Sequence, residues 1–238
     1  IMEKAIYEND TLKILENDST SIYSVEMKRP SMMLINSLVK TKLIGSSMVA
    51  KNYSRLKFNA SSVKSLTQFH QDQQIKTGSS CLSISVVANM LLTLSTQLNY
   101  LIQEYSHTIM GYTEEHIMVI NEDTFVVVCD EYFTEIANSK IQIRSPFTKT
   151  DFNVSPEMLK IERLPTMVHF KTSYFSLGCL LLLCLSTREE LYKEYLMDKK
   201  VETLIEGLDG RPIKGTKLYW TILRCLDEVA KNRTIILI

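Results

Sequence analysis

Acidic and imidazole side chains gather around one stretch, MGYTEEHIMVINEDTFVVVCDEY at residues 110–132. Two short apolar runs, HIMVI and TFVVVC, flank the turn NED, which is the pattern of a β-hairpin. Glu114 and Glu115 precede the first run, and Asp130 and Glu131 follow the second. Carboxylates at the mouth of a hairpin can act as general acids or bases, or can hold a metal ion. The residue types are therefore those of an active-site loop.

Two simple kinds of site fit this stretch poorly. His107, Glu114, Glu115 and His116 share one loop, but their spacing is not that of the H-E-x-x-H zinc motif and no cysteine joins them. A cysteine nucleophile is disfavoured as well, because Cys129 ends a β-type run and other cysteines lie in apolar helices, where burial makes a thiol inert. We therefore expect these to be solvated loop residues that hold no metal.

A long helix before the hairpin and several helices after it must position these residues. LSISVVANMLLTLSTQLNYLIQEY places apolar side chains on one stripe at helical spacing from residue 82 to residue 105. Residues 133–153 are polar and irregular. The elements expected after them are a helix start at 155–159, helices at 174–186 and 188–205, the turn LDGRP at 208–212, and a last helix at 217–230.

The front of the chain has a different texture, typical of strands. TLKIL (11–15) and SIYSVEM (21–27) indicate strands, and MMLINSLV (32–39) is compatible with a third. A short helix near 43–52 and strands near 54–58 and 63–69 complete the expected elements. A strand-rich front and a helical rear predict an α+β chain, divided near 78–82 into segments 1–80 and 81–238.

Composition narrows the class of protein. The 238 residues are 45% hydrophobic, and 27 basic residues balance 27 acidic ones, so we expect no nucleic-acid role. The longest apolar run, at 177–185, is about half the length of a membrane span, and IMEKAIYEND lacks the core of a secretory signal. Five cysteines without a C-x-x-C pair suit a reducing compartment. These observations favour a cytoplasmic protein without a membrane span.

Three motifs follow the hairpin: SPE at 155–157, YFSLGCLLLLCL at 174–185 and CLDEVAKNR at 225–233. They resemble the A-P-E, the D-x-W-S-x-G helix and the closing C-L-x-x-x-P-x-x-R of the C-terminal lobe of eukaryotic protein kinases. The likeness covers roughly 82–233. It implies a kinase-like two-lobe fold, with a reduced β-rich N-lobe at 1–80 and a mainly helical C-lobe at 81–238. It also implies a structural ion pair between Glu157 and Arg233.

The same resemblance indicates that the catalytic residues are lost. The family's H-R-D-x-x-x-x-N places its base on Gly111 and its metal-binding Asn on His116. Asp130 falls on the D-F-G aspartate, but Glu131 and Tyr132 replace the Phe and Gly. ENDSTSIYSV, between the two expected front strands, has no glycine to approach a phosphate and carries two acidic groups. The family's V-A-I-K lysine has no clear match in MMLINSLVK.

The resemblance therefore implies a catalytically inactive kinase-fold protein, a pseudokinase, that binds another protein or assembly. SPEMLKIERLP, HFKTSYFSLG and the reduced front also resemble divergent kinase-like proteins of large DNA viruses, which implies a virion-associated form. No cofactor is expected under this interpretation. An atypical kinase or nucleotide-binding switch, with Asp130 on the metal of Mg-ATP and Glu115 or Glu131 as an unconventional carboxylate, remains the alternative. A purely structural subunit is a third possibility.

Overall fold

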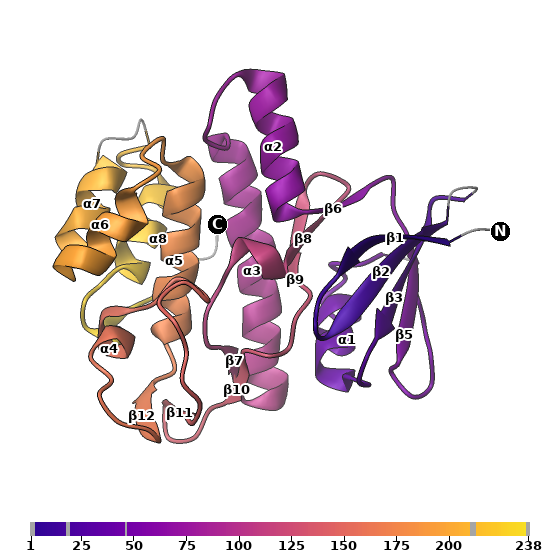
Figure 1. Cartoon of the computed structure of the whole chain (residues 1–238), viewed down its shortest axis with the longest axis horizontal. Coiled ribbons are helices and arrows are strands. Elements are labelled where there is room, and N and C mark those ends of the chain that lie inside the picture. The colour runs from indigo at the N-terminus through magenta and orange to yellow at the C-terminus, as the bar shows by residue number, and fades with distance from the viewer. Residues whose placement is uncertain (1–2, 18–19, 46, 210–212, 237–238) are drawn as a thin grey trace.

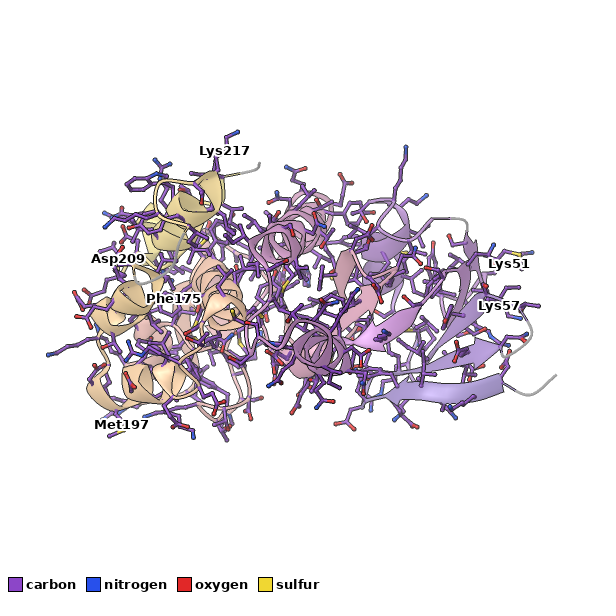
Figure 2. The ribbon with its side chains drawn as sticks, turned by 90° about the horizontal axis from the view of Figure 1, so that it is seen from above. Lys51, Lys57, Phe175, Met197, Asp209 and Lys217 are labelled. Atoms are coloured by element: carbon purple, nitrogen blue, oxygen red, sulfur yellow. The ribbon has the colours of Figure 1, made fainter. Side chains whose placement is uncertain are left out.

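The computed structural model describes residues 3–17, 20–45, 47–209 and 213–236, and it is an α+β protein (Figure 1). An antiparallel sheet lies at one end, most of the helices lie at the other, and the long helix α3 (Ile84–Tyr105) stands between them. Figure 2 shows the same division from above, with Lys51 and Lys57 at the sheet end and Met197 at the helical end. No helix in the described part of the chain is long and apolar enough to cross a membrane.

The front sheet has five strands in the order β1-β2-β3-β5-β4, all antiparallel. Helix α1 (Met32–Val39) packs against it, and Leu34, Ile35 and Leu38 join the apolar core beneath the sheet. The strand bounds are β1 (Glu3–Glu8), β2 (Leu12–Asn17), β3 (Ile22–Met27), β4 (Ser47–Val49) and β5 (Arg55–Asn59).

Three expectations for the front of the chain are wrong. MMLINSLV is helix α1 and not a strand, because its buried residues recur at helical spacing and the Ser31 side chain caps the helix by accepting from the Leu34 N–H at 3.3 Å. Residues 47–49 form strand β4 where a helix near 43–52 was expected. Only Val63–Ser65 of the expected strand at 63–69 is a strand, β6, and helix α2 (Leu66–Thr77) follows at once.

The expected hairpin at 117–127 is present and forms the centre of the molecule. Strands β8 (Ile117–Ile120) and β9 (Thr124–Val127) pair with each other, and β6 pairs with β8. Alternate side chains of the hairpin enter two different cores. Ile117, Val119, Phe125 and Val127 join the helical core, and Met118, Ile120 and Val126 join the core beneath the front sheet. Burial on both faces explains why these runs are continuously apolar and not alternating.

The helices in the rear of the chain follow the expected order with two differences: the last helix, expected at 217–230, ends at Cys225, and one expected helix is divided. Residues 188–205 form two helices, α6 and α7, because Lys199 adopts a left-handed conformation (φ 57°) that ends α6. The LDGRP turn at 208–212 lies largely outside the described residues. The remaining bounds are β7 (His107–Ile109), β10 (Phe133–Glu135), β11 (Lys140–Ile143), α4 (Pro156–Leu159), β12 (Thr166–His169), α5 (Thr172–Leu185), α6 (Leu191–Asp198), α7 (Val201–Asp209), α8 (Lys217–Cys225) and two short 3-10 helices at Glu114–His116 and Ala230–Asn232.

Candidate functional site

A pocket of about 420 Å³ lies where the front sheet meets the central hairpin. Four short segments line it: the end of β1 with the β1–β2 turn, the junction of β6 and α2, the loop before β8, and the segment after β9. The lining residues are Tyr7, Glu8, Asn9, Asp10, Ser65, Thr67, Glu115, His116, Cys129 and Glu131.

Side-chain hydrogen bonds of β1 and its turn hold the front wall of this pocket against the hairpin. The Asn9 Oδ1 accepts from the backbone N–H groups of Thr11 and Leu12, each at 2.8 Å, which closes the turn. The Tyr7 hydroxyl donates to the Glu115 carbonyl, and the Asn9 amide donates to Tyr7 at 3.1 Å. The turn that lines the pocket is therefore at residues 9–11. The sequence analysis placed the first turn of the sheet between the strands expected at 11–15 and 21–27, because it did not predict β1.

The pocket is acidic. Glu8, Asp10, Glu115 and Glu131 line it, and no lysine or arginine is among its described lining residues. A polyphosphate placed here would be repelled by carboxylates without a compensating cation, whereas a cation would be attracted.

His116, Cys129 and Glu131 bring their side chains together at one wall of the pocket. Their nitrogen, sulfur and oxygen atoms all lie within 4.8 Å of one another. The hairpin produces this meeting, because the Val128 N–H donates to the His116 carbonyl at 2.8 Å and so places Cys129 beside His116. The expectation that no cysteine joins these loop residues is therefore wrong in three dimensions.

Burial sets the protonation of the histidine and the cysteine. It lowers the pKa of His116 from its ordinary value of 6.5, so the neutral imidazole is favoured despite the nearby carboxylates of Glu131, Glu115 and Asp10. Burial likewise raises the pKa of the Cys129 thiol, although the Thr11 hydroxyl, 3.3 Å from its sulfur, opposes the shift. Without a bound cation this cysteine is a poor nucleophile, as expected from the sequence.

Gly111, the position to which the resemblance assigns a lost base, is closed off by Phe152. A Cβ atom at Gly111 would lie 2.1 Å from a carbon of the Phe152 ring, far inside van der Waals contact. The Asn153 N–H donates to the Tyr112 carbonyl at 3.0 Å and fixes this approach. Helix α5 also holds the segment at 111–112 in place, because the Tyr112 N–H donates to the Ser176 hydroxyl at 2.8 Å. No side chain can project from position 111 without displacing Phe152.

The remaining loop residues point elsewhere. Asp130 is half-buried but is not among the residues that line the acidic pocket, although both of its neighbours in sequence are. Glu114 lies 3.8 Å from the His70 ring, and the His107 ring bonds the Tyr105 carbonyl at 2.7 Å. Of the loop cluster, only Glu115 and His116 reach the pocket.

Glu157 and Arg233 form a bidentate ion pair. The two terminal nitrogens of the Arg233 guanidinium donate to the two carboxylate oxygens of Glu157 at 2.6 and 2.8 Å. The Arg233 side chain is fully buried, and its guanidinium lies over the Phe175 ring at 5.0 Å. Phe175 lies within the helical half (Figure 2). The pair joins α4 to the segment after α8, and neither residue lines the acidic pocket.

A second cavity, of about 630 Å³, lies between the segment at 131–137 and the segment at 140–151, which begins with strand β11. Glu131 lines both cavities. The larger one mixes acidic residues with Lys140 and Arg144 and holds no group of three potential metal ligands, so it offers no comparable chemical feature among the residues described.

Comparisons with known proteins add no family to these observations. A scan against protein-family models and a search of curated proteins both find no match for this chain. The function must therefore be inferred from the residues themselves.

Proposed function

We propose that this chain is a kinase-like pseudoenzyme that has lost phosphoryl transfer and acts as a scaffold or structural subunit for another protein. The order of its elements supports this proposal. A five-stranded sheet with one helix is followed by a long helix, a hairpin, the SPE segment at α4, and the apolar helix α5. The buried pair of Glu157 and Arg233 then joins the SPE segment to the end of the chain, as the resemblance implies.

The packing of Phe152 on Gly111 is the observation that most directly supports the proposed loss of kinase activity. A protein kinase places an aspartate at this position to orient the substrate hydroxyl, and a positioned base contributes about 10²–10⁴-fold to a rate. Here the space for any side chain is filled by an aromatic ring that is itself buried. A single substitution at Gly111 therefore cannot restore a base without rebuilding its surroundings.

The acidic pocket supports a second part of the proposal, namely that the chain does not bind a nucleotide. In the family, a lysine on the third strand pairs with the phosphates, and a glycine-rich turn lets the backbone approach them. Strand β3 carries no lysine, and Lys28, which follows it, pairs with Glu8 at 3.0 Å on the surface. The β1–β2 turn is Asn9-Asp10-Thr11, without glycine. A triphosphate would meet carboxylates where it needs cations.

Thermal unfolding with and without Mg-ATP tests this proposal. A ligand present at 100 times its dissociation constant stabilises the folded state by about 2.7 kcal/mol, a shift that is easily measured. We expect no shift with Mg-ATP. A clear shift that Asp130→Asn abolishes would favour the atypical kinase or nucleotide switch and would overturn the scaffold proposal.

The partner is another protein or assembly, and a cytoplasmic or virion-associated location is part of the proposal. The partner can be identified by purifying the chain from its natural source at native levels after chemical crosslinking. A fixed stoichiometry with one partner is expected. Recovery of the chain only as a free monomer would contradict a scaffold or structural-subunit role.

A further inference from the structure

We propose that His116, Cys129 and Glu131 form a binding site for one Zn²⁺ ion in the acidic pocket. This inference goes beyond the scaffold role and does not depend on the kinase resemblance. It rests on where the hairpin places three different ligand atoms.

The three side chains are close enough to share an ion. An imidazole nitrogen, a thiol sulfur and a carboxylate oxygen lie within 4.8 Å of one another. Tetrahedral zinc with bond lengths of about 2.0–2.3 Å needs its ligand atoms roughly 3.3–3.6 Å apart. Rotamer adjustments of an ångström or so close the remaining difference, and the exposed Glu131 is free to make most of them.

The backbone fixes two of the three ligands. His116 and Cys129 flank the two strands of the hairpin, and the hydrogen bond from the Val128 N–H to the His116 carbonyl sets their register. The Thr11 hydroxyl contacts the Cys129 sulfur at 3.3 Å and orients it from the front sheet. The His116 ring makes no hydrogen bond to the described residues, so both of its nitrogens remain available to a metal. A site held on strands in this way needs little ordering when the ion arrives.

The donor set and its surroundings select the ion. One nitrogen, one sulfur and one oxygen suit Zn²⁺, whereas Mg²⁺ and Ca²⁺ prefer oxygen ligands alone. Glu115 and Asp10 line the same pocket and add negative potential around the cation. Three protein ligands leave a fourth position open to water or to a group from a partner.

This arrangement differs from the metal centre of a protein kinase. There the D-F-G aspartate holds Mg²⁺ against the nucleotide phosphates. Here two of the three ligands, Cys129 and Glu131, lie on either side of Asp130 in sequence, and the described residues that line the pocket include no lysine or arginine to receive a phosphate. Asp130 therefore serves as an internal control.

Titration of the full-length chain with Zn²⁺, and with Co²⁺ as a spectroscopic probe, tests the site. We expect one ion per chain, a thiolate-to-cobalt charge-transfer band, and the visible absorption of a four-coordinate cobalt site. His116→Gln and Cys129→Ser should each remove the band and weaken Zn²⁺ binding at least about tenfold, the scale on which perturbed metal sites lose affinity. Cys81→Ser and Asp130→Asn should leave both unchanged.

Cys129 is buried, so Cys129→Ser can also damage the fold. Glu131→Gln avoids this problem because Glu131 is exposed, and it should weaken Zn²⁺ binding at least about tenfold while the far-ultraviolet dichroism stays unchanged. The proposal is overturned by the absence of stoichiometric binding, by binding that survives His116→Gln and Glu131→Gln, or by binding that Cys81→Ser or Asp130→Asn removes.

Discussion

Removal of the Glu157 carboxylate leaves the buried Arg233 guanidinium without its charged partner. The hydrogen bonds and the burial of Arg233 indicate how much unfolding free energy is lost. The Arg233 guanidinium has five N–H donors and makes five hydrogen bonds. Two go to Glu157, and the other three go to the carbonyls of Asp227, Lys171 and Glu228 at 2.7, 3.2 and 3.2 Å. Among the described residues Glu157 is the one charged partner of Arg233, so Glu157→Ala removes that charge and leaves two N–H groups unpaired.

Breaking one side of a buried ion pair costs about 3–5 kcal/mol of unfolding free energy. Arg233 is fully buried, but the Glu157 side chain is 23% exposed, so water can reach the vacated space and solvate part of the guanidinium. We therefore expect Glu157→Ala to cost about 3 kcal/mol, at the lower end of that range. Glu157→Gln, which keeps one acceptor oxygen, should cost less than Glu157→Ala.

Urea unfolding of the full chain, monitored by far-ultraviolet circular dichroism, measures these differences in unfolding free energy. The exposed pair of Glu190 and Lys193, whose charged atoms lie 2.8 Å apart, is the matched control, and Glu190→Ala should cost under about 1 kcal/mol. A loss below about 1 kcal/mol for Glu157→Ala, equal to that of the control, would refute the view that this pair fastens α4 to the end of the chain.

Three further substitutions test other parts of the structure. Gly111→Ala should cost about 1–3 kcal/mol in urea unfolding, because its Cβ would overlap the Phe152 ring, and Phe152→Leu in the same chain should recover part of that loss. Gln97→Leu should cost about 1–3 kcal/mol, because the buried Gln97 amide bonds the N–H and carbonyl of one residue of β9 and both would lose their partner. The Glu114 carboxylate, 3.8 Å from Nδ1 of His70, raises the pKa of His70 above 6.5. The stability that His70→Gln removes should therefore be present below pH 6.5 and should vanish as the pH rises through the raised pKa. A His70→Gln difference that instead grows with pH in urea unfolding would contradict this sign.

The sequence predicted well those elements whose hydrophobic pattern directly reflects which of their residues are buried. Helix α3 buries a stripe from Val87 to Leu101, and its spacing is visible in the sequence because the exposed positions, apart from Ile84 and Leu92, are polar. The hairpin at 117–127 was also visible, because two apolar runs flank a polar turn. The α+β class follows from these two features together with the strands β2, β3 and β5.

The front of the chain was harder to predict for physical reasons. Strand β1 is an edge strand with mostly exposed residues, so it lacks an apolar signature. MMLINSLV is rich in residues that suit either a strand or a helix, and its packing against the sheet together with the Ser31 cap selects the helix. Ser65 and Gln68, at capping-box spacing before α2, were a usable signal, since the Ser65 hydroxyl accepts from the Gln68 N–H at 3.1 Å.

The candidate metal site could not be found from ligand spacing along the sequence alone. His116 and Cys129 are separated by the whole hairpin, so a search for ligands at short fixed spacing passes over them. The same hairpin nevertheless predicts their meeting, because residues that flank paired strands lie opposite each other. A search for metal ligands in a strand-rich chain should therefore compare positions across each predicted turn as well as along the sequence.

The two proposals can be true together because they rest on different interactions. The Glu157–Arg233 pair and the Gly111–Phe152 contact depend on packing, and the Tyr132 ring, whose centroid lies 5.0 Å from that of Phe152 and 5.2 Å from that of His116, lies between this contact and the pocket. The acidic pocket lies at the junction of hairpin and front sheet, where catalysis would otherwise require cationic groups to receive a phosphate. Under the pseudokinase proposal no phosphate binds at this junction, so its carboxylates and its thiol oppose no ligand. A cation is then the ligand that such a pocket can hold, and a cation there would fasten the hairpin while the remaining surface stays available to a partner.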